Sequence, residues 1–477
     1  MKTPVLQKVY DPNRLRQQGH ELIDLMADHL RATLSGSAEK VIHYQKPEDE
    51  RDFWMEFFKD QSRSDFFPQV LKRTTHVHHP RYIGHQVCAP APQAALCGLV
   101  SSLLNNGMAV YEMGMAPSAM ERIITDLLAE KIGFDDKARG LLTSGGTLAN
   151  LTALLSARKA KLEEDVWLNG HGNRLAVMVS EEAHYCIDRA ARIMGLGSEG
   201  IIKVPVRPDF SMDTSVLNAY YEDARKKGLQ VFALVGSAPS TATGVYDDLH
   251  TLADFCSEKG MWFHVDAAHG GAAVFSRKYK ETVRGIHRAD SVVIDGHKMM
   301  LMSTITTALL FREGHHSHTT FSQEAEYLLQ HSEEEDWFNL AKRTFECTKT
   351  MMSLQWFLLW KTYGEELFDE NVTALYDLGR VLAGMIEADP ALELAVRPHS
   401  NIVCFRYTQQ GLNAAELDEI NRGIRKELLE EGEFYIVQTR IKKVQYLRCT
   451  IMNPFTTTSD LEALLALVKE KGRRITA

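Results

Sequence analysis

The chain has 477 residues, of which 44% are hydrophobic and 25% charged, with 31 glycines and only 14 prolines. This composition is typical of a globular protein of two or three domains, and it excludes disordered, collagen-like and fibrous classes. Because 63 Asp and Glu outnumber 54 Lys and Arg, for a formal net charge of -9, we expect a small-molecule enzyme that binds neither nucleic acid nor an anionic membrane.

The seven cysteines are far apart in the sequence and include no Cys-x-x-Cys pair. Their odd number and spacing disfavour both a disulfide framework and a zinc site. The first residues lack the apolar segment of a signal peptide, and no stretch approaches the roughly 18 uninterrupted apolar residues of a membrane span. We therefore expect a cytoplasmic protein without a bound metal.

The N-terminal region is predicted to be helical. Asp11 and Pro12 are an N-cap followed by proline at the first helical position, and leucines then recur at helical spacing as far as Leu34. A second helix-like pattern, rich in aromatic residues, covers residues 48–67. We expect residues 1-75 to form a helical arm, with its aromatic side chains at a subunit contact.

Between about residues 95 and 312, short apolar runs alternate with helical stretches. Runs of five or six residues rich in Val and Ile are typical of strands buried on both faces of a mostly parallel sheet. The predicted strands are Leu175 to Val179, Ile201 to Val206, Val231 to Val235, Trp262 to Val265, Ser291 to Ile294 and Thr306 to Phe311. Residues 76-350 are therefore predicted to form a large α/β domain.

A polar, acidic segment interrupts this rhythm at about residues 313-346, and we expect it to be a mobile surface loop. Its histidines, His315, His316 and His318, lack further ligand spacing and favour a solvated loop over a metal site. Residues 351-477 are predicted to form a connecting helix and a small C-terminal α+β domain. Its closing helix is expected to begin with Ser459 as the cap.

Two predicted strands end in residues that can do chemistry. The first delivers Asp266 and then small residues, and the second ends in His297 and Lys298. Ligands of open α/β sheets bind beyond the carboxyl ends of the strands, so the carboxylate and the amine can converge on one molecule. A desolvated lysine forms an imine with an aldehyde, and an aspartate keeps a pyridine nitrogen protonated.

Two further motifs are predicted to lie at the same edge. Thr143 to Asn150 supplies glycines and hydroxyls before an apolar helix, and a helix N-terminus binds phosphate. His184 follows another strand and can stack on a flat ring. Phosphate, aldehyde and pyridine belong together in pyridoxal 5'-phosphate, although each motif alone also suits a turn, a cap or a core residue.

As an ordered set, these motifs resemble those of the group II pyridoxal-phosphate decarboxylases, which act on glutamate, aromatic amino acids, cysteine sulfinate or diaminobutyrate. The resemblance runs from about His79 to Pro454 and implies the aspartate-aminotransferase-like fold (PLP fold type I). It implies that Lys298 is the Schiff-base lysine, Asp266 the pyridine-nitrogen partner and His184 the ring-stacking histidine. The other cofactor-binding residues that it implies are Gly146, Thr147, Thr241, Ala268, Asp295 and His297.

The resemblance also implies a function. We expect a homodimer that decarboxylates a small L-amino acid to its amine, with His85, Gln86, Tyr111 and His269 as candidates for the substrate pocket. Another lyase or an aminotransferase on the same fold is an alternative, and a scaffold that has lost catalysis is a further one.

One departure from the family concerns a mobile-loop tyrosine that is thought to protonate the substrate. Phe338 stands where that tyrosine is expected, and phenylalanine cannot donate a proton. Oxidative deamination to an aldehyde is therefore a second possible outcome of decarboxylation.

Overall fold

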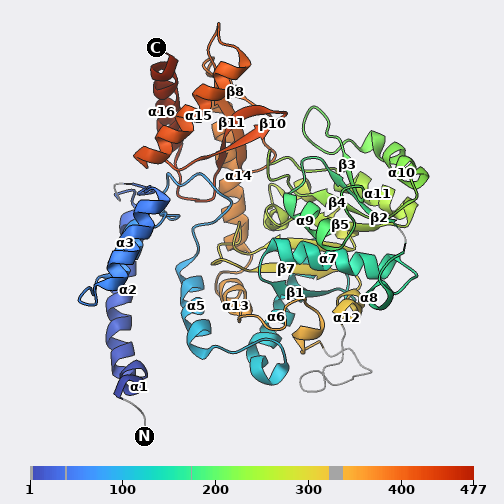
Figure 1. Ribbon diagram of the computed structural model, residues 1–477, viewed down its shortest axis with the longest axis horizontal. Helices are drawn as coiled ribbons and strands as arrows, with labels where there is room; N and C mark the ends of the chain where they lie inside the picture. Colours follow the sequence, from blue (N-terminus) through green and yellow to red (C-terminus); the bar gives the residue numbers. More distant parts are fainter. Residues whose placement is uncertain (1–3, 38–39, 173, 322–336, 477) are drawn as a thin grey trace.

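A computed structural model describes residues 4–37, 40–172, 174–321 and 337–476 of the chain. In these residues it contains a seven-stranded sheet and a four-stranded sheet. Figure 1 shows the larger sheet in the middle of the molecule, the smaller one near the C-terminus, and the N-terminal helices along one side.

The larger sheet has the strand order β1-β7-β6-β5-β4-β2-β3. Strands β2 to β6 run parallel to their neighbours, whereas β7 is antiparallel to both β6 and β1. The strands are β1 (Arg139–Thr143), β2 (Arg174–Ser180), β3 (Ile201–Val204), β4 (Leu229–Ser237), β5 (Trp262–Asp266), β6 (Ser291–Asp295) and β7 (Thr307–Phe311). The prediction of a mostly parallel α/β sheet is confirmed, and only β1 was missed.

Helices cover both faces of this sheet, which explains why its strands are continuously apolar. Val292 of β6 packs in one core cluster and its neighbour Val293 in the other. One face carries α7 (Gly146–Lys161) and α9 (Tyr185–Ile193), with α8 (Val166–Asn169) and α12 (His315–Phe321) beside α7. The other carries α6 (Tyr111–Ile132), α10 (Leu217–Lys226), α11 (Leu249–Lys259), α13 (Ser353–Tyr363) and α14 (Glu366–Glu387).

The smaller sheet is antiparallel throughout, with the order β10-β11-β9-β8. Its strands are β8 (Leu392–Leu394), β9 (Ile402–Tyr407), β10 (Val437–Ile441) and β11 (Val444–Thr450), and α15 (Ala414–Glu431) and α16 (Thr458–Thr476) pack with it. The predicted cap of the last helix was wrong. Thr457 caps it instead, because its Oγ1 accepts the Asp460 N–H (3.2 Å) while Asp460 accepts the Thr457 N–H (3.0 Å).

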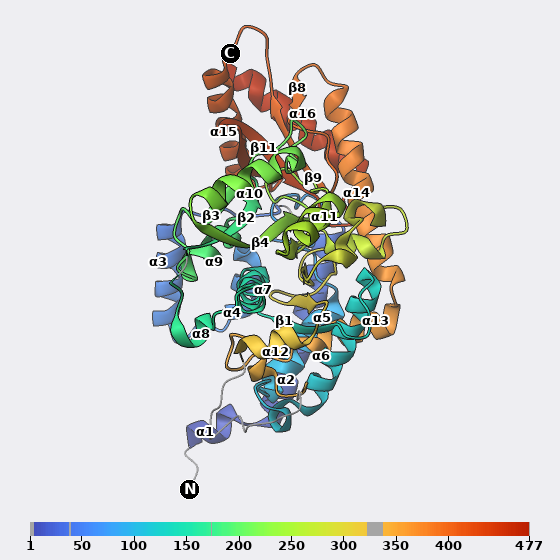
Figure 2. The ribbon, with the colours of Figure 1, turned by 90° about the vertical axis from the view of Figure 1, so that its right-hand side faces the viewer.

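The N-terminal region consists of helices, as the sequence predicts. They are α1 (Pro4–Val9), α2 (Pro12–Leu34), α3 (Pro47–Lys59) and α4 (Phe66–Arg73), whereas α5 (Pro92–Leu104) follows outside the predicted arm of residues 1-75. Asp11 caps α2 by accepting the Asn13 N–H at 2.9 Å. Figures 1 and 2 show α2 and α3 lying outside the layers of the large sheet. No helix of the described residues has the length and apolar character needed to cross a bilayer.

The polar segment after β7 differs in part from its prediction. Residues 315–321 form helix α12, in which Ser317, Thr320 and Phe321 are buried, so this part is not a solvated surface loop. The Thr320 hydroxyl donates to Ser156 of α7 at 2.9 Å, which anchors α12 to the large sheet's covering helix. Residues 322–336 of the predicted mobile loop lie outside the described residues.

Candidate active site

One cavity lies where β4, β5 and β6 end and α7 begins. It measures about 290 Å³. It is lined by Ser144, Gly145, Gly146, Thr147, Asn150, His184, Cys186, Ser237, Pro239, Thr241, Asp266, Ala268, His269, Asp295, His297, Lys298 and Ile305. The structure therefore brings together all nine residues that the sequence nominated for the cofactor.

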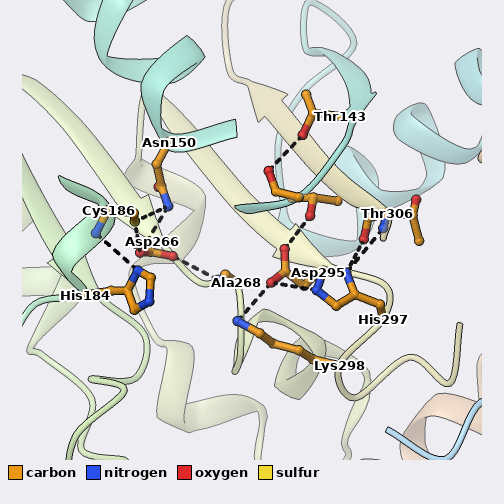
Figure 3. A network of polar contacts seen from close by, with 12 residues as sticks. Thr143, Asn150, His184, Cys186, Asp266, Ala268, Asp295, His297, Lys298 and Thr306 are labelled. Carbon is orange, nitrogen blue, oxygen red and sulfur yellow. Dashed lines mark hydrogen bonds and ion pairs between the residues drawn. The ribbon is translucent and has the colours of Figure 1, made fainter. Parts of the chain in front are cut away.

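Asp266 is the last residue of β5, and its carboxylate receives a hydrogen bond on each oxygen. Asn150 donates to Oδ2 at 3.2 Å, and the backbone N–H of Ala268 donates to Oδ1 at 3.2 Å. Burial raises the pKa of Asp266, an effect that the neighbouring His184 and Lys298 oppose. Figure 3 shows Asp266 between Asn150 and His184.

Lys298 follows β6 and forms an ion pair with Asp295, the last residue of that strand. The Lys298 Nζ atom lies 2.9 Å from Asp295 Oδ2, and His297 Nε2 lies 3.6 Å from the same oxygen. The Thr307 hydroxyl of β7 donates to the other oxygen. Burial acts to raise the pKa of Asp295, but Lys298, His297 and Thr307 together hold it below its ordinary value.

His184 caps helix α9, and its ring faces the cavity. Its Nδ1 accepts the backbone N–H of Cys186 at 3.3 Å. Burial lowers the pKa of His184 in spite of the nearby Asp266 carboxylate, so the ring is neutral at pH 7. A neutral, flat ring at this position is suited to stacking on an aromatic ligand.

The glycine motif, predicted to precede a helix, is itself the first turn of α7, which begins at Gly146. Gly145 has φ +102°, a conformation that favours glycine. A Cβ on Gly146 would lie 3.2 Å from Asp295 Oδ1. The N–H groups of Gly146 and Thr147 precede the first hydrogen bonds of this helix, and both residues line the cavity, which makes them donors for an anion.

Ser144, just before this turn, is in contact with a distant carboxylate. Its hydroxyl and its backbone N–H (3.4 Å) both donate to Glu346. Thr241 reaches the cavity from the loop after β4, and Ser240 anchors that loop by donating to the Glu182 carbonyl at 3.0 Å.

The candidate substrate residues do not all lie at the cavity, unlike the candidate cofactor residues. His85, Gln86 and Tyr111 do not line the cavity among the described residues, whereas His269 does. The His85 ring lies 5.8 Å from that of Tyr435, and the Tyr111 ring lies 5.5 Å from that of Phe338.

Two polar residues were not predicted: Asn150, which lines the cavity, and Arg448, whose charge acts on the cavity residue His269. Asn150 stands one helical turn after Gly146, so the helix spacing of the glycine motif could have revealed it. Arg448 of β11 is 6% exposed, and its Nε and Nη2 atoms have no hydrogen-bond partner in the described part of the chain. No local sequence signal distinguishes such an arginine from an ordinary strand residue.

Comparisons with known proteins agree with one another. The family model described as "Pyridoxal-dependent decarboxylase conserved domain" matches residues 47–408. L-2,4-diaminobutyrate decarboxylase from Acinetobacter baumannii is 29% identical over 87% of this chain and 84% of its own. L-aspartate decarboxylase dtxS4 from Metarhizium robertsii is 31% identical over 85% and 82%.

Among solved structures, one similar to this chain is the glutamate decarboxylase domain of the diaminobutyrate-pyruvate transaminase and L-2,4-diaminobutyrate decarboxylase from Vibrio parahaemolyticus. The TM-score is 0.82 at 26% identity, with 95% of this chain and 96% of that chain covered.

Proposed function

Since this chain belongs to the pyridoxal-dependent decarboxylase family, we propose that Lys298, Asp266 and His184 are the residues with which it decarboxylates an L-amino acid. It is a carboxy-lyase with pyridoxal 5'-phosphate as its cofactor, like the amino acid decarboxylases that it matches. The observation that carries the residue assignment is the meeting of the Lys298 amine, the Asp266 carboxylate and the start of α7 in one cavity.

The residues around the cavity fit this cofactor. The start of α7, with Gly146 and Thr147, offers N–H groups to a phosphate, and Gly146 leaves room that a Cβ would reduce. Lys298 offers an amine to an aldehyde, and Asp266 a buried carboxylate to a pyridinium N–H. When bound, the cofactor supplies a ring that accepts the electron pair left behind as carbon dioxide departs.

The chain's own groups then have distinct tasks. Lys298, whose Nζ lies 2.9 Å from Asp295 Oδ2, would hold the cofactor covalently, and as a free amine it would be able to carry a proton. In this cavity His184 would stack on the cofactor ring, Ala268 and Thr241 would border the ring, and His297 and Asp295 would lie near the phosphate. Asp266 would offer its carboxylate to the pyridine nitrogen, with His184 and Lys298 opposing the effect of burial on its pKa.

Arg448 is proposed to bind the carboxylate of the substrate. A buried guanidinium with unpaired N–H groups is costly unless an anion binds it, and arginine holds a carboxylate with two parallel hydrogen bonds. Its positive charge contributes to the lowered pKa values of both His85 and His269, in addition to burial. It therefore acts electrostatically on the cavity wall and on the candidate substrate residues.

The relatives do not define the side chain of the substrate, because their names refer to amino acids of opposite charge, diaminobutyrate and aspartate. His85, Gln86 and Tyr111 are retained as proposed pocket residues. The test is a panel of the twenty amino acids with diaminobutyrate and cysteine sulfinate, assayed for carbon dioxide release without a keto-acid acceptor. If no member of the panel released carbon dioxide, the proposed activity would be wrong.

A second product is proposed alongside the amine. Phe338 lacks a hydroxyl and packs against Tyr111, so the expected proton donor of the loop is replaced by an apolar ring. Reaction of the decarboxylated carbon with molecular oxygen, followed by hydrolysis with water, would then release an aldehyde, ammonia and hydrogen peroxide.

We also propose a homodimer. Helices α5 and α6 expose apolar side chains, among them Leu99 (55%), Leu103 (66%) and Met115 (59%), and a patch of this kind marks an interface. The arm of residues 1-75 and the small C-terminal part of residues 351-477 are proposed to flank the large domain of residues 76-350. Sedimentation of an active 53.8 kDa monomer at micromolar concentration would contradict the dimer.

A cytoplasmic location is proposed as well, because all seven cysteines are free in the structure, as in a reducing compartment.

A further inference from the structure

A chain of buried hydrogen bonds leads from the interior of the large sheet to Asp266. Trp262 Nε1 donates to Ser291 Oγ at 2.9 Å, and Ser291 Oγ lies 2.8 Å from His264 Nδ1. His264 Nε2 lies 2.7 Å from Asn150 Oδ1, and Asn150 Nδ2 donates to Asp266 Oδ2 at 3.2 Å. The four residues behind Asp266 are at most 1% exposed.

The chemistry of the two ends fixes the direction of every bond in this chain. A carboxylate only accepts, so the Asn150 amide turns its NH₂ toward Asp266 and its oxygen toward His264. His264 Nε2 must then carry the proton, and its Nδ1 accepts the Ser291 hydroxyl. The indole of Trp262 only donates, and Ser291 Oγ accepts it.

The histidine in the chain is neutral, as this direction requires. Burial lowers the pKa of His264 to about 3. A neutral ring with Nε2 protonated leaves the Asn150 amide one favourable orientation, because a flipped amide would set its oxygen against the Asp266 carboxylate. The histidine thus acts as an orienting group.

We propose that Asn150 is a positioning residue that keeps Asp266 charged and aimed at the pyridine nitrogen, and that His264 fixes the orientation of Asn150. This inference rests on the proposed role of Asp266. The other groups that act on this carboxylate are His184, Lys298, Asp295 and Cys186, whose Sγ lies 4.0 Å from Oδ2. Among the side chains that the structure describes, Asn150 and Cys186 alone have hydrogen-bond geometry to it, and a thiol is a weak donor.

The experiment compares two cofactors, pyridoxal phosphate and its 1-deaza analogue, in which carbon replaces the pyridine nitrogen. In Asn150→Leu, the dissociation constant of pyridoxal phosphate should rise by about tenfold or more, as expected for losing a hydrogen bond to a charged group. The dissociation constant of the analogue should change less than about twofold, because it lacks the nitrogen that Asp266 serves.

Three variants make this comparison decisive. Thr152→Val is the matched control, because Thr152 is buried on the same helix and its hydroxyl has no partner in the described residues. It should leave both dissociation constants unchanged. His264→Leu should shift the pyridoxal phosphate constant in the same direction as Asn150→Leu, by a smaller factor. Asn150→Ser serves if Asn150→Leu does not fold.

The outcomes separate the inference from the function on which it rests. The inference is supported if both Asp266→Asn and Asn150→Leu weaken the binding of pyridoxal phosphate more than the binding of the 1-deaza analogue. The inference about Asn150 is overturned if the dissociation constant of pyridoxal phosphate rises selectively in Asp266→Asn but not in Asn150→Leu. It is also overturned if Asn150→Leu weakens the binding of both cofactors equally. Either result leaves the role of Asp266 intact. If Asp266→Asn changes the dissociation constants of pyridoxal phosphate and of the 1-deaza analogue by the same factor, both the proposed role of Asp266 and the inference are overturned.

Discussion

The amine of Lys298 lies 2.9 Å from the carboxylate of Asp295, three residues earlier at the end of β6. The nucleophile of the proposed reaction is therefore held in an ion pair, and Asp295 is only 3% exposed. An ammonium group paired with a buried carboxylate must lose both its proton and its partner before it can attack an aldehyde.

The first prediction concerns this pair. In Asp295→Asn, covalent capture of pyridoxal phosphate by the apoprotein at pH 7 should be several-fold faster than in the wild type, because the carboxylate that pairs with Lys298 Nζ at 2.9 Å is gone. Stopped-flow absorbance measures the rate. Asp290→Asn, at the other end of the same strand, is the control and should not change it. Slower capture in Asp295→Asn would contradict this account of the pair.

The second prediction concerns Lys349 and Glu121, a salt bridge with both side chains 1% exposed. Glu121 also accepts the Leu142 N–H at 2.9 Å, and Lys349 donates to the Leu142 carbonyl, so the pair clamps β1 just before the glycine motif. Lys349→Met should lower the free energy of unfolding by about 3–5 kcal/mol, because it leaves an unpaired buried carboxylate.

Urea unfolding measures this loss. The double variant Lys349→Met with Glu121→Leu should recover most of it, since both charges are then gone. Arg31→Ala, which removes an exposed ion pair with Asp28, should have no measurable effect. A loss in the double variant as large as in the single one would show that the pair itself is stabilising.

The third prediction is a pH dependence of stability. Burial lowers the pKa of His264 to about 3, and burial together with Lys298 and Arg448 lowers that of His269 to about 3. Unfolded histidines titrate near pH 6.5, so the unfolded chain binds more protons between about pH 3 and 6.5. Stability should therefore fall on acidification through this window, by about 1.4 kcal/mol per pH unit for each histidine.

Urea unfolding of the apoprotein at a series of pH values from 6.5 to 5 measures that slope. His269→Gln should reduce this slope by the contribution of one proton, about 1.4 kcal/mol per pH unit, because one of the two neutral histidines is gone. An unchanged slope in His269→Gln would mean that His269 is protonated in the folded state.

The fourth prediction concerns the product. The wild type under air should form aldehyde and peroxide beside the amine, because Phe338 cannot protonate the decarboxylated carbon. Phe338→Tyr should lower the aldehyde fraction by about tenfold or more, in line with the size of general acid catalysis. Trp337→Tyr is the control. Amine alone from the wild type, with no change in Phe338→Tyr, would contradict the prediction.

The sequence predicted those parts of the fold whose signals are local. The Val- and Ile-rich run of β6 is buried on both faces, and its end delivers Asp295 and Lys298 to the cavity. Strand β1 was missed because Arg139 and Gly140 interrupt its short apolar run. Its identity as a strand depends on pairing with β7, which comes more than 150 residues later.

The polar contacts of the site were harder to predict, because their partners are far apart in the chain. Asn150 contacts Asp266 across 116 residues, and Ser144 contacts Glu346 across 202. Arg448 gives no local signal at all, since it alternates with apolar residues in an ordinary strand. Reactive residues at the ends of strands can be predicted from a sequence. Contacts between distant elements cannot, because they depend on how those elements pack.

The proposed function depends most directly on covalent binding of the cofactor by Lys298. The direct measurement is borohydride reduction of the holoenzyme, followed by peptide mass spectrometry to locate the pyridoxyl group. In the wild type, Lys298 should be the one modified residue. The Lys298→Ala variant should still fold, but it should carry no pyridoxyl group and release no carbon dioxide. A pyridoxyl group on another lysine, or full activity in Lys298→Ala, would contradict it.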